Sequence, residues 1–152
     1  MRKVMLLAVV LVACSKAEAP PADTAAMAPA PAPAMLTAAD VAGTWSGTSM
    51  AETGDSVTGR WTVTRVSDTE ARLVFEGSTD SVTYAMTYDA DSMMATSQPF
   101  ADPAAPKGSG NVVVRSVGRL RDGKLVGTST TMAAAKPDSV IARGRWEATR
   151  VP

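Results

Sequence analysis

The feature that most constrains this chain is a hydrophobic period of two, which runs from Val41 toward the C-terminus. In residues 140–149, small or apolar residues alternate with residues that are mostly charged or polar. Such alternation is typical of a strand in an antiparallel sheet that buries one face. Because turn signals recur about every dozen residues, the pattern predicts an all-β domain. The expected strands are 42–50, 58–67, 70–77, 81–89, 91–98, 111–121, 124–132 and 139–150.

The connections between these strands are also readable. Asp122-Gly123 is the clearest turn, because this pair supplies the positive φ values that a type I′ hairpin requires. Residues 98–110 are rich in Pro, Ala and Gly and form the one long connection. Residues 47–65 and 127–150 both carry Gly-Thr-Ser, Asp-Ser-Val and Gly-Arg-Trp in that order. This likeness indicates either a repeated hairpin or a shared Thr- and Val-rich composition.

Eight consecutive antiparallel strands have two edges that must be protected. Closure into a barrel removes both edges, and eight strands leave room for side chains or one small ligand. We therefore predict a single antiparallel up-and-down eight-stranded barrel at residues 41–152. In its last strand the inward residues should be Val140, Ala142, Gly144, Trp146 and Ala148.

Two short motifs of this domain resemble those of a known fold group. Gly43-Thr44-Trp45 in the first strand, with Arg145-Trp146 in the last, resembles the calycin plan of lipocalins and avidins. In that plan a Gly-x-Trp motif opens the barrel and its Trp plugs one end. The chain has no Thr-Asp-Tyr triplet of lipocalins, and the biotin pocket of avidins cannot be matched. The resemblance therefore implies the barrel architecture and no binding residue.

The N-terminus has the pattern of a secretory signal. Met1-Arg2-Lys3 precedes an apolar run that ends at Ala13, which is too short to cross a bilayer as a helix of about 20 residues. Leu-Val-Ala-Cys at residues 11–14 resembles the lipobox of bacterial lipoproteins. That resemblance implies cleavage before Cys14 and acylation of its thiol. The alternative is an ordinary secreted protein with a Cys at the cleavage site.

The expected organisation is a lipoprotein signal peptide at 1–13, lipidated Cys14 with an Ala/Pro-rich flexible linker through residue 40, and the barrel from residue 41. Proline blocks helix and alanine buries little surface, so the linker should be extended. The residue after the cysteine is Ser15, not Asp. By resemblance to lipoprotein sorting, this points to the outer membrane, with the head facing the periplasm or the cell surface.

Composition excludes several functions. The chain has no His and a single Cys, which removes Ser–His–Asp, Cys–His and zinc chemistry. Its formal charge of zero lacks the basic excess of a nucleic-acid-binding protein. We find no Gly-x-Ser-x-Gly or Ser-x-x-Lys motif, so we expect no enzyme, cofactor or metal. A His-independent hydrolase is the less favoured alternative.

The remaining candidates are a pocket and a surface. Inward small residues leave volume for a ligand or let the strands coil tightly, and the large aromatic residues line a pocket or form the core. We expect a monomeric head that binds a small apolar molecule or an envelope protein, with a structural cap as the alternative. The candidate pocket wall is Trp45, Trp61, Tyr84, Tyr88 and Trp146. The candidate basic surface, or solubilising charge, is Arg115, Arg119, Arg121, Arg143 and Arg145.

Overall fold

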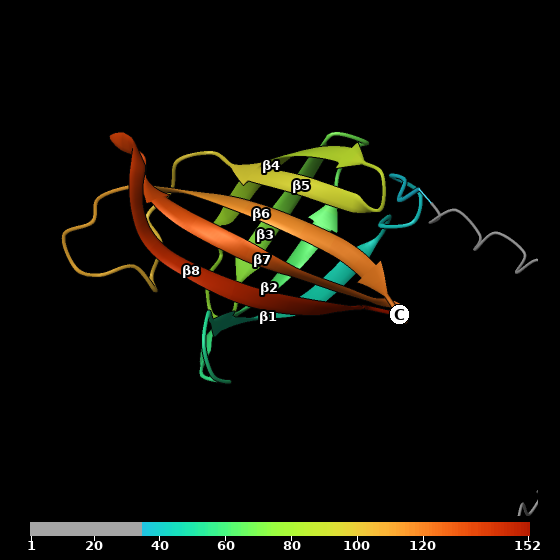
Figure 1. Ribbon diagram of the computed structural model, residues 1–152, viewed down its shortest axis with the longest axis horizontal. Coiled ribbons are helices and arrows are strands. Elements are labelled where there is room, and N and C mark those ends of the chain that lie inside the picture. The colour runs from blue at the N-terminus through green and yellow to red at the C-terminus, as the bar shows by residue number, and fades with distance from the viewer. Residues whose placement is uncertain (1–34) are drawn as a thin grey trace, which may run out of the picture. The chain divides into compact units, whose positions relative to one another are not determined.

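The structure is a computed structural model that describes residues 35–152 (Figure 1). The expected signal peptide at 1–13, the lipidation site Cys14 and the expected linker up to residue 34 lie outside the described residues. The described chain forms eight strands in one closed antiparallel barrel, so the predicted all-β fold is confirmed. The strands are β1 (Thr44–Ala51), β2 (Val57–Arg65), β3 (Glu70–Phe75), β4 (Ser81–Asp89), β5 (Ser92–Ser97), β6 (Val112–Arg121), β7 (Lys124–Ala133) and β8 (Lys136–Arg150).

The barrel is an up-and-down meander that closes on itself. Each strand pairs with its neighbour in the chain, and β8 returns to pair with β1 from Trp45↔Arg150 to Ala51↔Gly144. Between β6 and β7, Asp122 and Gly123 have φ values of 50° and 76°, as a type I′ turn requires. Over residues 45–51 of β1 and 144–150 of β8, closure leaves neither strand as a free edge.

The two ends of the barrel differ (Figure 1). We call one the plugged end; it carries the N-terminal segment 36–43, the short turns after β2, β4 and β6, and the C-terminus. We call the other the loop end; it carries residues 52–56, 76–80, 98–111 and 134–135. Figure 1 shows the long connection 98–111 at the left and the C-terminus at the right.

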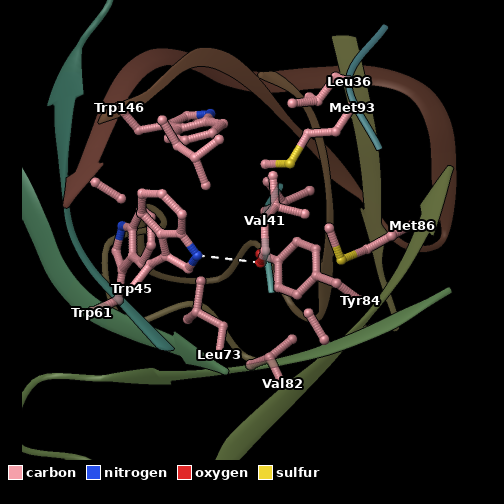
Figure 2. Close-up of a cluster of buried hydrophobic side chains, with 14 of the residues drawn as sticks. Leu36, Val41, Trp45, Trp61, Leu73, Val82, Tyr84, Met86, Met93 and Trp146 are labelled. Carbon is pink, nitrogen blue, oxygen red and sulfur yellow. Dashed lines mark hydrogen bonds between the residues drawn. The ribbon is translucent and has the colours of Figure 1, made fainter. Parts of the chain in front are cut away.

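The plugged end is filled by the segment that precedes β1. Leu36 and Val41 are buried, and the Leu36 amide donates a hydrogen bond to the Ala90 carbonyl at 2.8 Å. Within the described residues, packing onto the barrel therefore includes Leu36 and Val41. The indole of Trp45, only 2% exposed, donates to the Val41 carbonyl at 3.2 Å (Figure 2). The Arg150 guanidinium lies 4.6 Å from the centre of the same ring.

Two other indoles lie directly against glycines of the barrel wall. A Cβ added at Gly47 would be 2.2 Å from the ring of Trp61. A Cβ at Gly118 or Gly127 would be 2.6 or 2.5 Å from the ring of Trp146. These distances are too short for any side chain. The glycines are therefore needed because the rings occupy the space where a Cβ would be.

The last strand departs from the expected alternation. Thr131 pairs with Ala142 and Met132 pairs with Val140, so Ile141 is an extra residue in β8. A bulge of this kind shifts the phase of a strand by one residue. Val140 is consequently 43% exposed, and its predicted inward position is wrong; Ile141 packs against the core instead.

We expect the substitution Gly127→Ala to destabilise the barrel. The added Cβ would be 2.2 Å from the Val117 carbonyl oxygen and 2.5 Å from Trp146, so the strand or the ring must move. Overpacking of this kind costs about 1–3 kcal/mol, measurable by urea unfolding.

The matched control is Gly59→Ala, because a Cβ at Gly59 in β2 would meet no atom within 4 Å. This variant should change the free energy of unfolding by less than about 0.5 kcal/mol. Equal effects of the two substitutions would show that the Trp146 contact does not govern stability.

Candidate functional site

The barrel encloses a cavity of about 230 Å³. At its plugged end the wall is buried and includes Val41 and Trp45. At its loop end the wall includes the exposed residues Thr58, Ala142 and Arg143. The cavity is therefore closed at the plugged end and reaches the surface at the loop end.

Aromatic rings form much of the wall. Four of the five predicted pocket residues line the cavity: Trp45, Trp61, Tyr84 and Trp146. Figure 2 shows the three indoles on one side of the interior and Tyr84 on the other. The rings of Trp61 and Trp146 meet edge to face, with centres 6.0 Å apart. Phe75 completes the aromatic part of the wall.

The three indole N–H groups all find acceptors within the protein. Trp45 donates to the Val41 carbonyl at 3.2 Å, Trp61 to the Ser49 hydroxyl at 2.9 Å and Trp146 to the Thr128 carbonyl at 3.2 Å. Pairing of this kind avoids the cost of burying an unsatisfied polar group. What these rings offer to the cavity is therefore apolar area and π faces, not hydrogen-bond donors.

The fifth predicted residue, Tyr88, does not line the cavity. Its ring packs at the plugged end, 5.6 Å from the Arg65 guanidinium. Burial raises the pKa of the Tyr88 hydroxyl, which is the one buried side-chain polar atom without a hydrogen-bond partner among residues 35–152. Tyr88 therefore belongs to the packing beneath the cavity.

Some small inward residues make room for packed side chains, and others line the cavity. Gly47, Gly118 and Gly127 accommodate the indole rings and so serve packing. Ser116 and Ser129, which pair across β6 and β7, line the cavity. The rings of Trp61 and Trp146 therefore lie against the wall, and the two serines add hydroxyl groups to the cavity lining.

The long connection between β5 and β6 folds over part of the loop end. Phe100 and Val112 exchange two backbone hydrogen bonds, of 3.0 and 2.8 Å. The Phe100 ring also stacks on Phe75, with centres 5.9 Å apart. These contacts hold the connection in place, and Asp102 and Ala105 thereby become part of the cavity wall.

Three charged residues contribute to that wall: Arg65, Asp102 and Arg143. The Arg65 side chain is 7% exposed and donates to the Ser67 carbonyl at 2.6 Å, to Asp68 at 2.9 Å and to the Ala38 carbonyl. Asp102 accepts a hydrogen bond from the Ala104 amide at 2.8 Å. Burial raises the pKa of the Tyr84 hydroxyl, and the negative charge of Asp102 raises it further.

The five arginines of the candidate basic surface are all exposed, but they do not form a uniform positive stripe. Arg119 and Arg121 share the carboxylate of Asp91, at 3.2 and 3.3 Å. Hydrogen bonds from Ser92 and Arg119 to Asp91 lower the pKa of that carboxyl. Arg145 contacts Asp55 at 3.4 Å. Arg115 and Arg143 lie in one row of the sheet, separated by Thr130 of β7.

Sequence reasoning missed Asp102 and Phe75 as wall residues. The missed signal was Phe100, an aromatic residue in a connection otherwise rich in Pro, Ala and Gly. An isolated aromatic residue of this kind indicates a loop that packs back onto the domain. Polar residues next to the aromatic residue in the sequence are then also brought onto the domain.

Comparisons with protein-family models, with curated proteins and with solved structures found no match for this chain. Within residues 35–152, no three acidic or cysteine side chains gather in a way that could hold a metal ion. No helix in that part of the chain has the length and apolar character needed to cross a membrane.

We expect Trp45→Ala to lower the free energy of unfolding by about 3–5 kcal/mol. The substitution removes the ring that fills the plugged end, its hydrogen bond to Val41 and its contact with Arg150. Urea unfolding measures the loss. A loss below about 1 kcal/mol would show that the segment 36–43, not the ring, closes this end.

Proposed function

We propose that this protein is a membrane-anchored envelope lipoprotein with a calycin-like barrel that binds a small apolar molecule in its cavity. The observation that carries the proposal is a cavity with an aromatic wall, closed at one end and open at the other. A barrel that served only as a structural cap would have no need of an open interior.

The cavity volume limits the size of the ligand. Pockets for drug-sized ligands measure roughly 300–1,000 Å³, and this cavity measures about 230 Å³. An engineered apolar cavity of about 150 Å³ takes up benzene. The ligand should therefore be small, such as a single ring with a short side chain.

The position of the N-terminal segment is compatible with an anchor. Residues 36–43 meet the barrel at the plugged end, and the cavity opens at the loop end. A chain that leads from an acylated Cys14 would therefore join the barrel at the end opposite the mouth of the cavity. Several acyl chains bury enough methylene groups to anchor a protein stably in a bilayer.

Binding is tested by filling the cavity. The substitution Ser116→Leu places a larger apolar side chain on the inner face of β6. We expect wild-type protein to bind 3-phenylpropan-1-ol, and Ser116→Leu to bind it at least tenfold more weakly. Tryptophan fluorescence is the readout, because the indoles of Trp61 and Trp146 line the cavity. A Cys14→Ser background avoids detergent, which would compete for the cavity.

The matched control is Thr96→Leu on β5, where the threonine is exposed and does not line the cavity. It should bind the alcohol as wild-type protein does. Thermal unfolding of each variant verifies that the barrel is intact. A wild-type protein that does not bind the alcohol at millimolar concentration contradicts the proposal.

Anchoring is tested separately with Cys14→Ser. In a bacterial host supplied with labelled palmitate, the wild-type chain should carry the label and sediment with membranes. The variant should lose the label, because a hydroxyl does not replace the thiol in the lipobox. A wild-type chain without label would identify an ordinary secreted protein.

A further inference from the structure

We propose that the ligand of the cavity is an organic cation, an amine attached to an apolar and preferably aromatic body. This inference rests on the proposed function, because it names the chemical class that the same cavity selects. It follows from the charges and rings that border the cavity and from the partners that each of them already has.

Arg65 borders the cavity at the plugged end. Its guanidinium is engaged by the Ser67 carbonyl at 2.6 Å, by Asp68 at 2.9 Å and by the Ala38 carbonyl. The ring of Tyr88 lies 5.6 Å from the same group. Because its charge is paired with Asp68 and three of its five N–H donors are engaged within the protein, Arg65 is less available to a ligand than a free guanidinium.

Asp102 borders the cavity at the opposite end, the loop end. The Phe100–Val112 bridge and the stacking of Phe100 on Phe75 fix the start and end of the connection that carries it. Asp102 is half-buried, and its Oδ1 accepts the Ala104 amide at 2.8 Å. No ion pair in residues 35–152 involves this carboxylate. Asp102 therefore presents an uncompensated negative charge to the cavity.

A buried hydroxyl of the cavity wall is close enough to sense that charge. Tyr84 lines the cavity from β4, and the carboxylate of Asp102 raises the pKa of its hydroxyl beyond the effect of burial. The charge of Asp102 therefore acts on a group of the cavity wall. A cation placed beside Tyr84 would be stabilised by the same field.

The aromatic wall also favours a positively charged ligand. The π faces of Trp, Tyr and Phe attract cations within about 6 Å of the ring centre, most strongly where water is excluded. The indole N–H groups are all turned to acceptors in the protein, so they do not repel a cation. Five aromatic rings and one carboxylate around a small cavity together suit an ammonium group with an apolar body.

The positive charge of Arg143 would disfavour a cationic ligand. Arg143 borders the mouth, but it belongs to the outward-facing set of β8 and is exposed, in one row with Thr130 and Arg115. Solvent screens a charge in that position more than it screens Asp102. Selection of an anion by Arg143 is therefore the competing outcome of the test.

The test uses three probes with one apolar body and different charges: 3-phenylpropylamine, 3-phenylpropan-1-ol and 3-phenylpropanoate. Each is titrated into the full chain carrying Cys14→Ser at pH 7, with tryptophan fluorescence as the readout. The amine should bind tightest and the carboxylate weakest. The substitution Asp102→Asn should weaken binding of the amine about tenfold or more, the usual worth of a hydrogen bond to a charged group. It should leave binding of the alcohol almost unchanged.

Asp102→Asn keeps a carbonyl oxygen that can accept the Ala104 amide, so the connection should retain its turn. The matched control is Asp80→Asn, which removes an exposed carboxylate at the same end of the barrel without touching the cavity wall. This control should bind the three probes as the parent does.

Two outcomes overturn the inference and are distinguishable from each other. If the alcohol binds but the amine has no advantage, or if the carboxylate binds tightest, the cavity is a binding site with a different selectivity. If none of the three probes binds, the proposed function itself is wrong.

Discussion

The contact between two indole rings and three glycines of the barrel wall is the constraint on which the rest of the interior depends. Trp61 occupies the space above Gly47, and Trp146 occupies the space above Gly118 and Gly127. In an eight-stranded barrel, inward side chains normally fill the interior or surround one small ligand. Here the rings of Trp61 and Trp146 lie against the wall, and the ring of Trp45 fills the plugged end. All three supply apolar burial for a small domain, and all three line the cavity.

Closure of the barrel and packing of the N-terminal segment provide hydrogen-bond partners for backbone and side-chain polar groups. Pairing of β1 with residues 144–150 of β8 provides partners for the backbone groups where the barrel closes. At the plugged end, the carbonyls of the segment before β1 accept hydrogen bonds from Trp45, Arg65 and Arg150. The three side chains thereby tie that segment to β1, β2 and β8. In the part of the chain that the structure describes, these bonds close one end of the barrel, and the cavity reaches the surface at the loop end.

The chemistry of the cavity depends on a part of the chain that has no regular structure. The connection 98–111 is held by Phe100, which pairs with Val112 and stacks on Phe75. This attachment places Asp102 in the cavity wall. The strands supply the apolar and aromatic surface, and the loop supplies an acidic group. Loops on rigid scaffolds often carry the residues that decide specificity, because they can change without disturbing the core.

The all-β class, the eight strands, the turn at Asp122-Gly123 and four of the residues that line the cavity could be predicted from the sequence. These follow from alternation and turn chemistry, which are local properties of the chain. Three features appear only in the folded barrel: Ile141 is an extra residue in β8, Tyr88 lies outside the cavity wall and Asp102 lies within it. Each of these depends on cross-strand register or on packing between segments far apart in the chain. Register and long-range packing produce no periodic pattern in the sequence, because both are set only when the barrel closes.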